Sequence, residues 1–173
     1  MVRSKLKDCN KDEEDKRVIF QRLIKFFHSI GKNKHDFGED DPKVAAVALL
    51  FYIIEADGEE KNSEKKVLKD IVAREYSVAG DDLKTLIEAG RQAQHDSIDL
   101  FVFTSILKRH LDKEQCVSFI GLLWEIAYAD GYVYELEDNL VWRIAELMDV
   151  DRNERLALKK HIAQINQIEH EEI

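Results

Sequence analysis

Turn-forming residues and cysteines are scarce in this sequence. It has one proline, seven glycines and two cysteines among 173 residues. A chain so poor in turn formers is typical of long helices joined by short loops. Cys9 and Cys116 match neither a zinc-ligand spacing nor a disulfide framework, so we expect a reduced, cytosolic protein.

Long apolar runs are also missing. The longest, VAAVALLFYII over residues 44–54, is followed by Glu55 and Asp57 and is shorter than the roughly 18 residues that a membrane-spanning helix needs. The first residues, MVRSKLKDCNKDEEDKR, lack the apolar segment of a signal peptide. Hydrophobic residues nevertheless make up 45% of the chain, which excludes a fully disordered protein.

The charge is negative and unevenly distributed. The formal net charge of −9 argues against general binding of nucleic acids. Residues 16–35 contain six lysines or arginines and no acid, so removing this +6 from the total of −9 leaves −15 on the rest of the chain. We predict a disordered charged tail over residues 1–15, a basic amphipathic helix over 16–35 and a helical domain over 36–173.

Helical periodicity recurs along the chain, without sustained strand alternation. It predicts an all-α fold, a compact bundle of about eight helices. Helix caps are predicted at Asp41–Pro42, at Asp112 with Gln115, and at Asp151 with Glu154. The segments 42–58 and 116–131 are apolar on nearly every side, so we expect them at the centre of the bundle.

Both central segments end in Ala-Asp-Gly, with a glutamate six residues after the glycine. Alignment of residues 49–72 with residues 122–145, an offset of 73, gives eight identities over 24 positions. The identical residues of the first copy are Leu49, Leu50, Ile53, Ala56, Asp57, Gly58, Glu64 and Ile71. An internal pseudo-repeat of a central helix, a turn and two following helices is therefore predicted.

The repeated turn has two interpretations. In one it is purely structural, because glycine allows a positive φ angle, Asp accepts local hydrogen bonds and Glu lies at the positive end of the next helix. In the other it forms a site for a divalent cation, calcium or magnesium, since such ions bind several carboxylate oxygens. The ligands of that site would be Asp57, Glu64, Asp130 and Glu137. An EF-hand does not fit, because the first loop position would be isoleucine in both copies and the helical pattern continues to the Asp.

Two other groups of residues are candidate contact surfaces. Tyr132 and Tyr134 lie in the second turn, where exposed aromatic side chains are unusual, and are predicted to bind a partner protein. The basic segment either contacts an anionic membrane surface or packs as an ordinary helix on the acidic body. Its candidate membrane-surface residues are Arg17, Arg22, Lys25, Lys32 and Lys34.

Motifs for catalysis are not found. The sequence has no His-Glu-x-x-His zinc motif, no glycine-rich phosphate loop and no recognisable nucleophile context for Ser or Cys. We therefore predict that the protein is not an enzyme.

The stretches EADGEEKNSEKK and AYADGYVYELEDNLVWRIAELM, together with DDPKVAAVALL, resemble the TerB-like family of bacterial helical proteins linked to tellurite resistance. The resemblance covers roughly residues 20–165 and is closest to a stand-alone branch. It implies a compact helical bundle without known enzymatic activity, associated with stress-response and metal-ion systems, often at the cytoplasmic face of the membrane. The acidic residues of its Ala-Asp-Gly turns have been proposed to bind metal, which would apply here to Asp57, Glu64, Asp130 and Glu137. A J-domain co-chaperone role is not supported, since no His-Pro-Asp occurs.

The predicted function is that of a non-catalytic scaffold or sensor in a tellurite or metal-ion stress response. Its expected partners are other proteins of that system, and its expected location is the cytoplasm, with peripheral contact at the inner face of the membrane as an option. The alternative is a protein- or membrane-interaction module without a metal, in which the Ala-Asp-Gly turns are purely structural.

Overall fold

The computed structural model describes residue 38, residues 40–76 and residues 80–171. These residues form seven α-helices and no strand, as predicted for the fold class. The helices are α2 (Pro42–Ile54), α3 (Asn62–Tyr76), α4 (Asp81–Asp96), α5 (Leu100–His110), α6 (Lys113–Ala127), α7 (Glu135–Leu147) and α8 (Arg152–Glu171). The predicted charged tail and basic helix lie outside the described residues.

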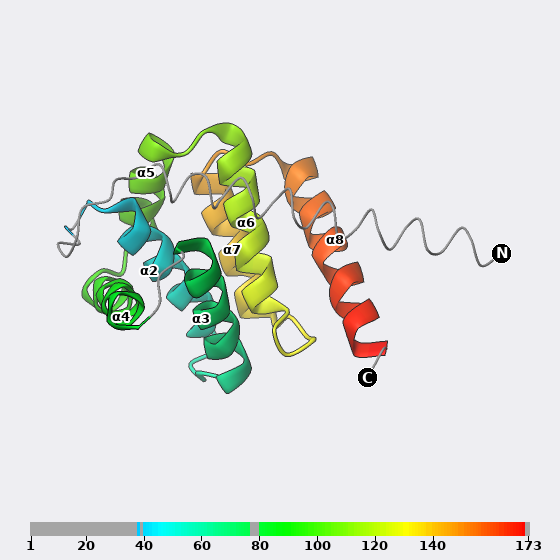
Figure 1. Cartoon of the computed structure of the whole chain (residues 1–173). Coiled ribbons are helices and arrows are strands. Elements are labelled where there is room, and N and C mark those ends of the chain that lie inside the picture. The colour runs from blue at the N-terminus through cyan, green and yellow to red at the C-terminus, as the bar shows by residue number, and fades with distance from the viewer. Residues whose placement is uncertain (1–37, 39, 77–79, 172–173) are drawn as a thin grey trace.

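Helices α2 and α6 form the centre of the bundle, as their apolar composition predicts. Every residue of α2 is buried except Lys43 and Tyr52, and α6 is buried from Ser118 to Trp124. The two helices contact each other, and the others surround them (Figure 1). Helix α2 packs mainly against α4 and α5, and α6 packs mainly against α7 and α8.

The helix boundaries repeat with the offset found in the sequence. Helices α2 and α6 end at Ile54 and Ala127, and α3 and α7 begin at Asn62 and Glu135. The shift between copies is the same at both boundaries and equals the offset of the sequence alignment. The triplet α2–α3–α4 thus corresponds to α6–α7–α8, and α5 connects the two copies. The predicted pseudo-repeat of a central helix, a turn and two following helices is confirmed.

The predicted caps are present at the helix starts. The Asp41 side chain accepts a hydrogen bond from the backbone N–H of Lys43, with Pro42 at the first helical position. Asp112 and Gln115 exchange hydrogen bonds of 2.8 Å in a capping box. These short polar contacts satisfy backbone donors that the helix itself leaves free.

The predicted ends of the central helices are wrong. The apolar pattern predicts helix up to Asp57 and Asp130, whereas α2 ends at Ile54 and α6 at Ala127. After these residues the backbone tightens into turns bonded between residues i and i+3. The Gly58 N–H bonds the Glu55 carbonyl at 3.1 Å, and the equivalent bond of Gly131 measures 2.8 Å. The acidic residues therefore lie in turns and not in the last helical turn.

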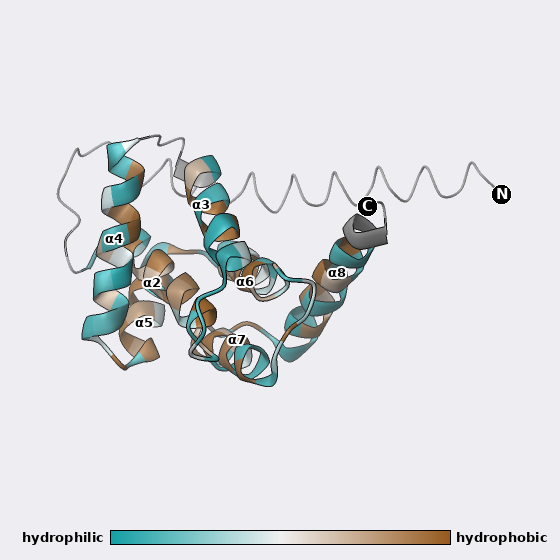
Figure 2. Cartoon of the chain, turned by 90° about the horizontal axis from the view of Figure 1, so that it is seen from below, coloured by the Kyte–Doolittle hydropathy of each residue, from teal (hydrophilic) through white to brown (hydrophobic). Residues whose placement is uncertain are grey.

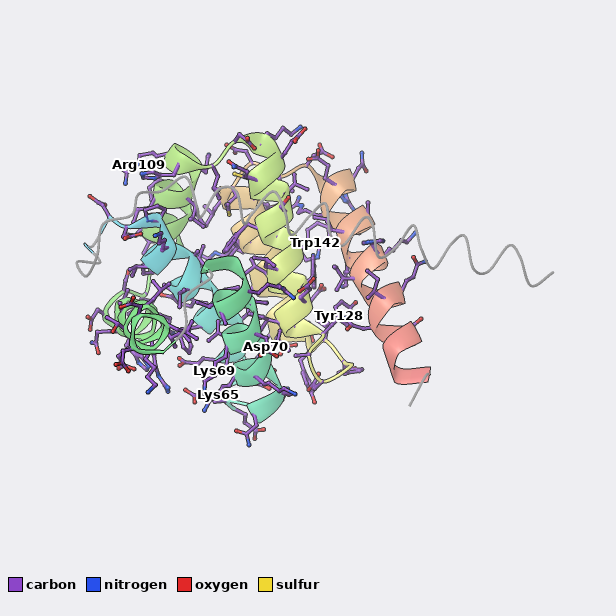
Figure 3. The ribbon with its side chains drawn as sticks, in the orientation of Figure 1. Lys65, Lys69, Asp70, Arg109, Tyr128 and Trp142 are labelled. Carbon is purple, nitrogen blue, oxygen red and sulfur yellow. The ribbon has the colours of Figure 1, made fainter. Side chains whose placement is uncertain are left out.

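The outer helices have one apolar and one polar face, whereas α2 is apolar apart from Lys43 (Figure 2). Helix α8 packs mainly on α6, and its Arg155 also contacts α7, with the guanidinium carbon 4.4 Å from the centre of the Trp142 ring. Trp142 of α7 and Tyr128, the residue that follows α6, lie on the side that faces α8 (Figure 3). Within the described part of the chain, no helix has both the length and the apolar character needed to cross a membrane.

Candidate acidic site

The two Ala-Asp-Gly turns adopt the same local structure. Gly58 and Gly131 have φ angles of 80° and 84°, which favour glycine over any residue with a Cβ atom. Asp57 accepts a hydrogen bond from the N–H of Glu59 at 3.0 Å, and Asp130 accepts the equivalent bond from Tyr132 at 3.1 Å. Each aspartate thus closes its own turn through one oxygen.

The glutamate that follows each turn is buried in the first turn of the next helix. Glu64 of α3 and Glu137 of α7 are each only 1% exposed. The Glu137 Oε2 atom accepts a 2.8 Å hydrogen bond from the N–H of Tyr134, three residues earlier. The partial positive charge at the N-terminal end of each helix offsets part of the cost of burying these carboxylates.

The two turns meet at one end of the bundle, the lower edge in Figure 1, and Lys61 lies between them. The Lys61 Nζ atom is 3.4 Å from Asp57 and 3.5 Å from Glu64, both of its own copy. It is 3.1 Å from Asp130 of the other copy. A single ammonium group therefore joins carboxylates that are far apart in the sequence.

Lys61 also contacts the residue that corresponds to it in the second copy. The offset between the two copies pairs Lys61 with Tyr134. The Lys61 Nζ atom lies 4.0 Å from the centre of the Tyr134 ring, a cation–π contact. Equivalent positions of the two copies are thus occupied by different residues, Lys61 and Tyr134, and these two side chains contact each other. We call the four carboxylates together with Lys61 the acidic cluster.

Burial and crowding of negative charge alter the ionisation of the cluster. Burial raises the pKa of Glu137 to about 7, and the charges of Glu64 and Asp130 act in the same direction. Burial also raises the pKa of Glu64, although Lys61 opposes this shift. In contrast, the hydrogen bond from the Glu59 N–H is the main reason why the pKa of Asp57 is lowered.

The positive charge of Lys61 is held firmly. Burial by itself would lower the pKa of Lys61, but its ion pair with Asp130 and the charges of Glu64 and Asp57 raise it above its usual value. Lys61 is therefore an ammonium ion at neutral pH. It offsets one of up to four negative charges, so the cluster stays acidic.

Two observations bear on whether the cluster fits a divalent cation. Its oxygen donors are the type that calcium and magnesium prefer, and the buried Glu64 Oε2 atom has no hydrogen-bond partner among the described residues. However, in the part of the chain that the structure describes, no three His, Cys, Asp or Glu side chains are arranged to hold a metal ion. The residue types fit a cation, whereas the present arrangement is closed by Lys61.

Lys61 is not among the site residues predicted from the sequence. Its spacing, four residues after Asp57 and three before Glu64, is the spacing of neighbours on a helical turn and could have indicated it. The offset alignment could have done so too, because Lys61 carries the only positive charge in either turn, residues 55–64 or 128–137. The contact with Asp130 has no sequence signal, since it depends on how the two copies pack.

The other predicted site residues lie outside this cluster or at its edge. Tyr132 is 64% exposed and Tyr134 41% exposed, and their rings pack edge to face with centres 5.1 Å apart. Leu136, 57% exposed, extends this surface. The predicted membrane-surface residues from Arg17 to Lys34 lie outside the described residues, so membrane contact stays a prediction.

The fold and the cluster define a class: an all-helical bundle made of two related halves that meet at a shared acidic turn. A family model described as tellurite resistance protein TerB matches residues 43–160, more than half of the chain. The chain belongs to the TerB family. The matched region runs from the start of α2 into α8 and contains both acidic turns. Comparisons with curated proteins and with solved structures each found no match.

Proposed function

We propose that this protein is a non-catalytic scaffold or sensor in a tellurite or metal-ion stress response, and that its acidic cluster binds a divalent cation such as calcium or magnesium. Family membership supports the general role. The cation is supported by one observation in particular, the convergence of Asp57, Glu64 and Asp130, from equivalent turns in the two halves of the chain, on one ammonium group.

The ligands of this cation would be Asp57, Glu64, Asp130 and Glu137. Glu64 and Glu137 contribute carboxylates that are already removed from water, and one Glu64 oxygen lacks a partner among the described residues. Carboxylates buried close to one another repel, and this repulsion is relieved when a cation joins them. A bound ion would therefore link the α2–α3 turn to the α6–α7 turn and stabilise the contact between the halves.

Titration with a cation tests this proposal. We expect calorimetry to detect binding of calcium or magnesium at millimolar concentration or below, with an increase in the melting temperature. At 100 times the dissociation constant the stabilisation is about 2.7 kcal/mol. The double variant Asp57→Asn/Asp130→Asn should lose it, whereas Asp70→Asn/Glu88→Gln, which removes two exposed acids of α3 and α4, should not. The proposal is rejected if none of calcium, magnesium, manganese and zinc binds the native protein.

A second candidate function, protein interaction, is favoured by the exposed surface at the second turn. Tyr132, Tyr134 and Leu136 present two aromatic rings and one aliphatic side chain to solvent. The matching positions of the first turn are Glu59, Lys61 and Ser63, so this apolar surface belongs to one copy alone. Aromatic side chains of this kind are enriched at the centres of protein interfaces.

A substitution at Tyr132 tests this surface separately from the acidic cluster, because the Tyr132 side chain is more exposed than those of Tyr134 and Leu136. We expect Tyr132→Ser to change the free energy of unfolding by less than about 0.5 kcal/mol. It should nevertheless abolish recovery of partner proteins in a cross-linked pull-down. Phe101→Ser removes an exposed ring from α5 and serves as the control that keeps the partners. Partners retained by Tyr132→Ser, or lost equally in both variants, would contradict an interaction at this surface.

A further inference from the structure

We infer that Lys61 is a built-in counter-ion that occupies the cation position of the acidic cluster, so that a divalent cation binds there only by displacing its ammonium group. The inference rests on the proposed function for the identity of the ligand. It goes beyond that function because it names the residue that controls access to the site.

The contacts of Lys61 are those expected of a ligated cation. Among the described residues, the ion pairs of Asp57, Glu64 and Asp130 all involve the Lys61 Nζ atom, at 3.1–3.5 Å. An ammonium group is a compact point charge, which makes it the side-chain group most similar to a bound metal ion. The Lys61 side chain is only 21% exposed, so most of its length is fixed within the protein.

The pseudo-symmetry shows why this position is special. The two copies share the aspartate, the glycine and the glutamate of the turn, but they differ at the position occupied by Lys61 in one and Tyr134 in the other. The first copy thus supplies a positive charge, and the second supplies the ring over which that charge sits. Because one lysine contacts acids of both copies, a second lysine at position 134 would bring two ammonium groups together.

The charges show why the lysine can be displaced. Three carboxylates pair with one ammonium group, and the Glu64 Oε2 atom has no hydrogen-bond partner among the described residues although Glu64 is only 1% exposed. A divalent cation offers twice the positive charge of the lysine and can bind several oxygens at once. The released ammonium group regains its hydration in water. The lysine therefore competes with the cation. The apparent affinity is the intrinsic affinity multiplied by the fraction of molecules in which Lys61 has left the cluster.

The test removes the charge of Lys61 and measures cation binding. Calcium chloride and magnesium chloride are titrated by calorimetry into the native protein, Lys61→Gln and Lys65→Gln. Lys65 lies on α3 (Figure 3) and pairs with Glu60, outside the cluster, so it controls for the change in net charge. We expect Lys61→Gln to lower the dissociation constant about tenfold or more and Lys65→Gln to leave it within about twofold.

The outcomes distinguish this inference from the proposed function. If the native protein binds a cation and Lys61→Gln binds it no more tightly, the inference is wrong and the proposed function stands. If only Lys61→Gln binds, the inference holds and the proposed function fails for the native chain. If neither binds, both fail.

Folding provides a second measurement in case Lys61→Gln is unstable without a cation. Three carboxylates would then lack their counter-ion, and we expect a lower melting temperature in a chelator. Added calcium or magnesium should restore the helical circular dichroism and the melting temperature of Lys61→Gln more than those of Lys65→Gln. If neither calcium nor magnesium does so at millimolar concentration, the inference is wrong.

Discussion

Gly90→Ala is expected to lower the free energy of unfolding by about 3 kcal/mol, at the upper end of what an added methyl group costs in a packed core. Gly90 lies in α4 where this helix crosses α2. A Cβ atom at this position would come 2.3 Å from the Val47 Cγ1 atom, 2.5 Å from its Cβ atom and 3.2 Å from its carbonyl carbon. Rotation of the Val47 side chain does not move its Cβ atom, so the two helices must separate.

Urea denaturation followed by circular dichroism measures this change, and Gly121 provides the control. Gly121 is a buried glycine of α6, but a Cβ atom there would meet only Leu158, at an ordinary 3.8 Å. Gly121→Ala should therefore gain the helix propensity of alanine, worth up to about 1 kcal/mol. Equal effects of the two substitutions would show that α2 and α4 are not in such close contact.

Stability is expected to fall as the pH rises through neutrality, because of Glu137. Its pKa is about 7 in the folded protein against an ordinary value of 4.5, so the folded state binds its proton more tightly than the unfolded state. The resulting stabilisation is fully present below about pH 4.5 and is lost as the pH rises through about 7. The full difference corresponds to about 3 kcal/mol, of which about 2 kcal/mol falls between about pH 5.5 and 8.5.

Glu137→Gln isolates this contribution, since glutamine resembles the protonated acid. In a metal-free buffer, the free energy of unfolding of this variant should vary less with pH than that of the native protein. It should exceed the native value above about pH 7. Glu135→Gln changes an exposed acid in the same helical turn and should retain the native pH dependence. If Glu137→Gln also retains it, the pKa of Glu137 is not raised in the folded protein.

The acidic cluster is costly for folding, which is relevant to its proposed role. Burying Glu64 and Glu137 removes two carboxylates from water, and one ammonium group offsets only part of their charge. Apolar residues at these positions would form an ordinary helix contact. A sequence that places the same costly turn in both halves is consistent with a site whose occupancy the protein can sense.

Much of the fold follows from local features of the sequence. The apolar helices α2 and α6 had to be central, because a helix without a polar face is stable only when it is surrounded. The caps at Asp41 and Asp112 could be predicted because they depend on residues within one turn of each other. The internal repeat likewise predicted that the second half would copy the first.

The ends of the central helices could not be predicted in the same way. Apolar spacing continues to Asp57 and Asp130, but the hydrogen bonds change to shorter turns after Ile54 and Ala127. Periodicity reports which side of a helix is buried and does not report which carbonyl each N–H will bond. Boundaries are therefore the part of a helix that sequence patterns locate least well.

By itself, the sequence determined the class of fold, the duplication and the four acids that both turns would present. Tertiary structure alone decided that Asp57, Glu64 and Asp130 would converge on one ammonium group, which comes from Lys61 of one copy and rests on Tyr134 of the other. The physical reason is that residues in one turn interact through the local backbone, which the sequence specifies directly. Charges in different halves of the chain interact only after the packing of α2 against α6 has brought the two turns together.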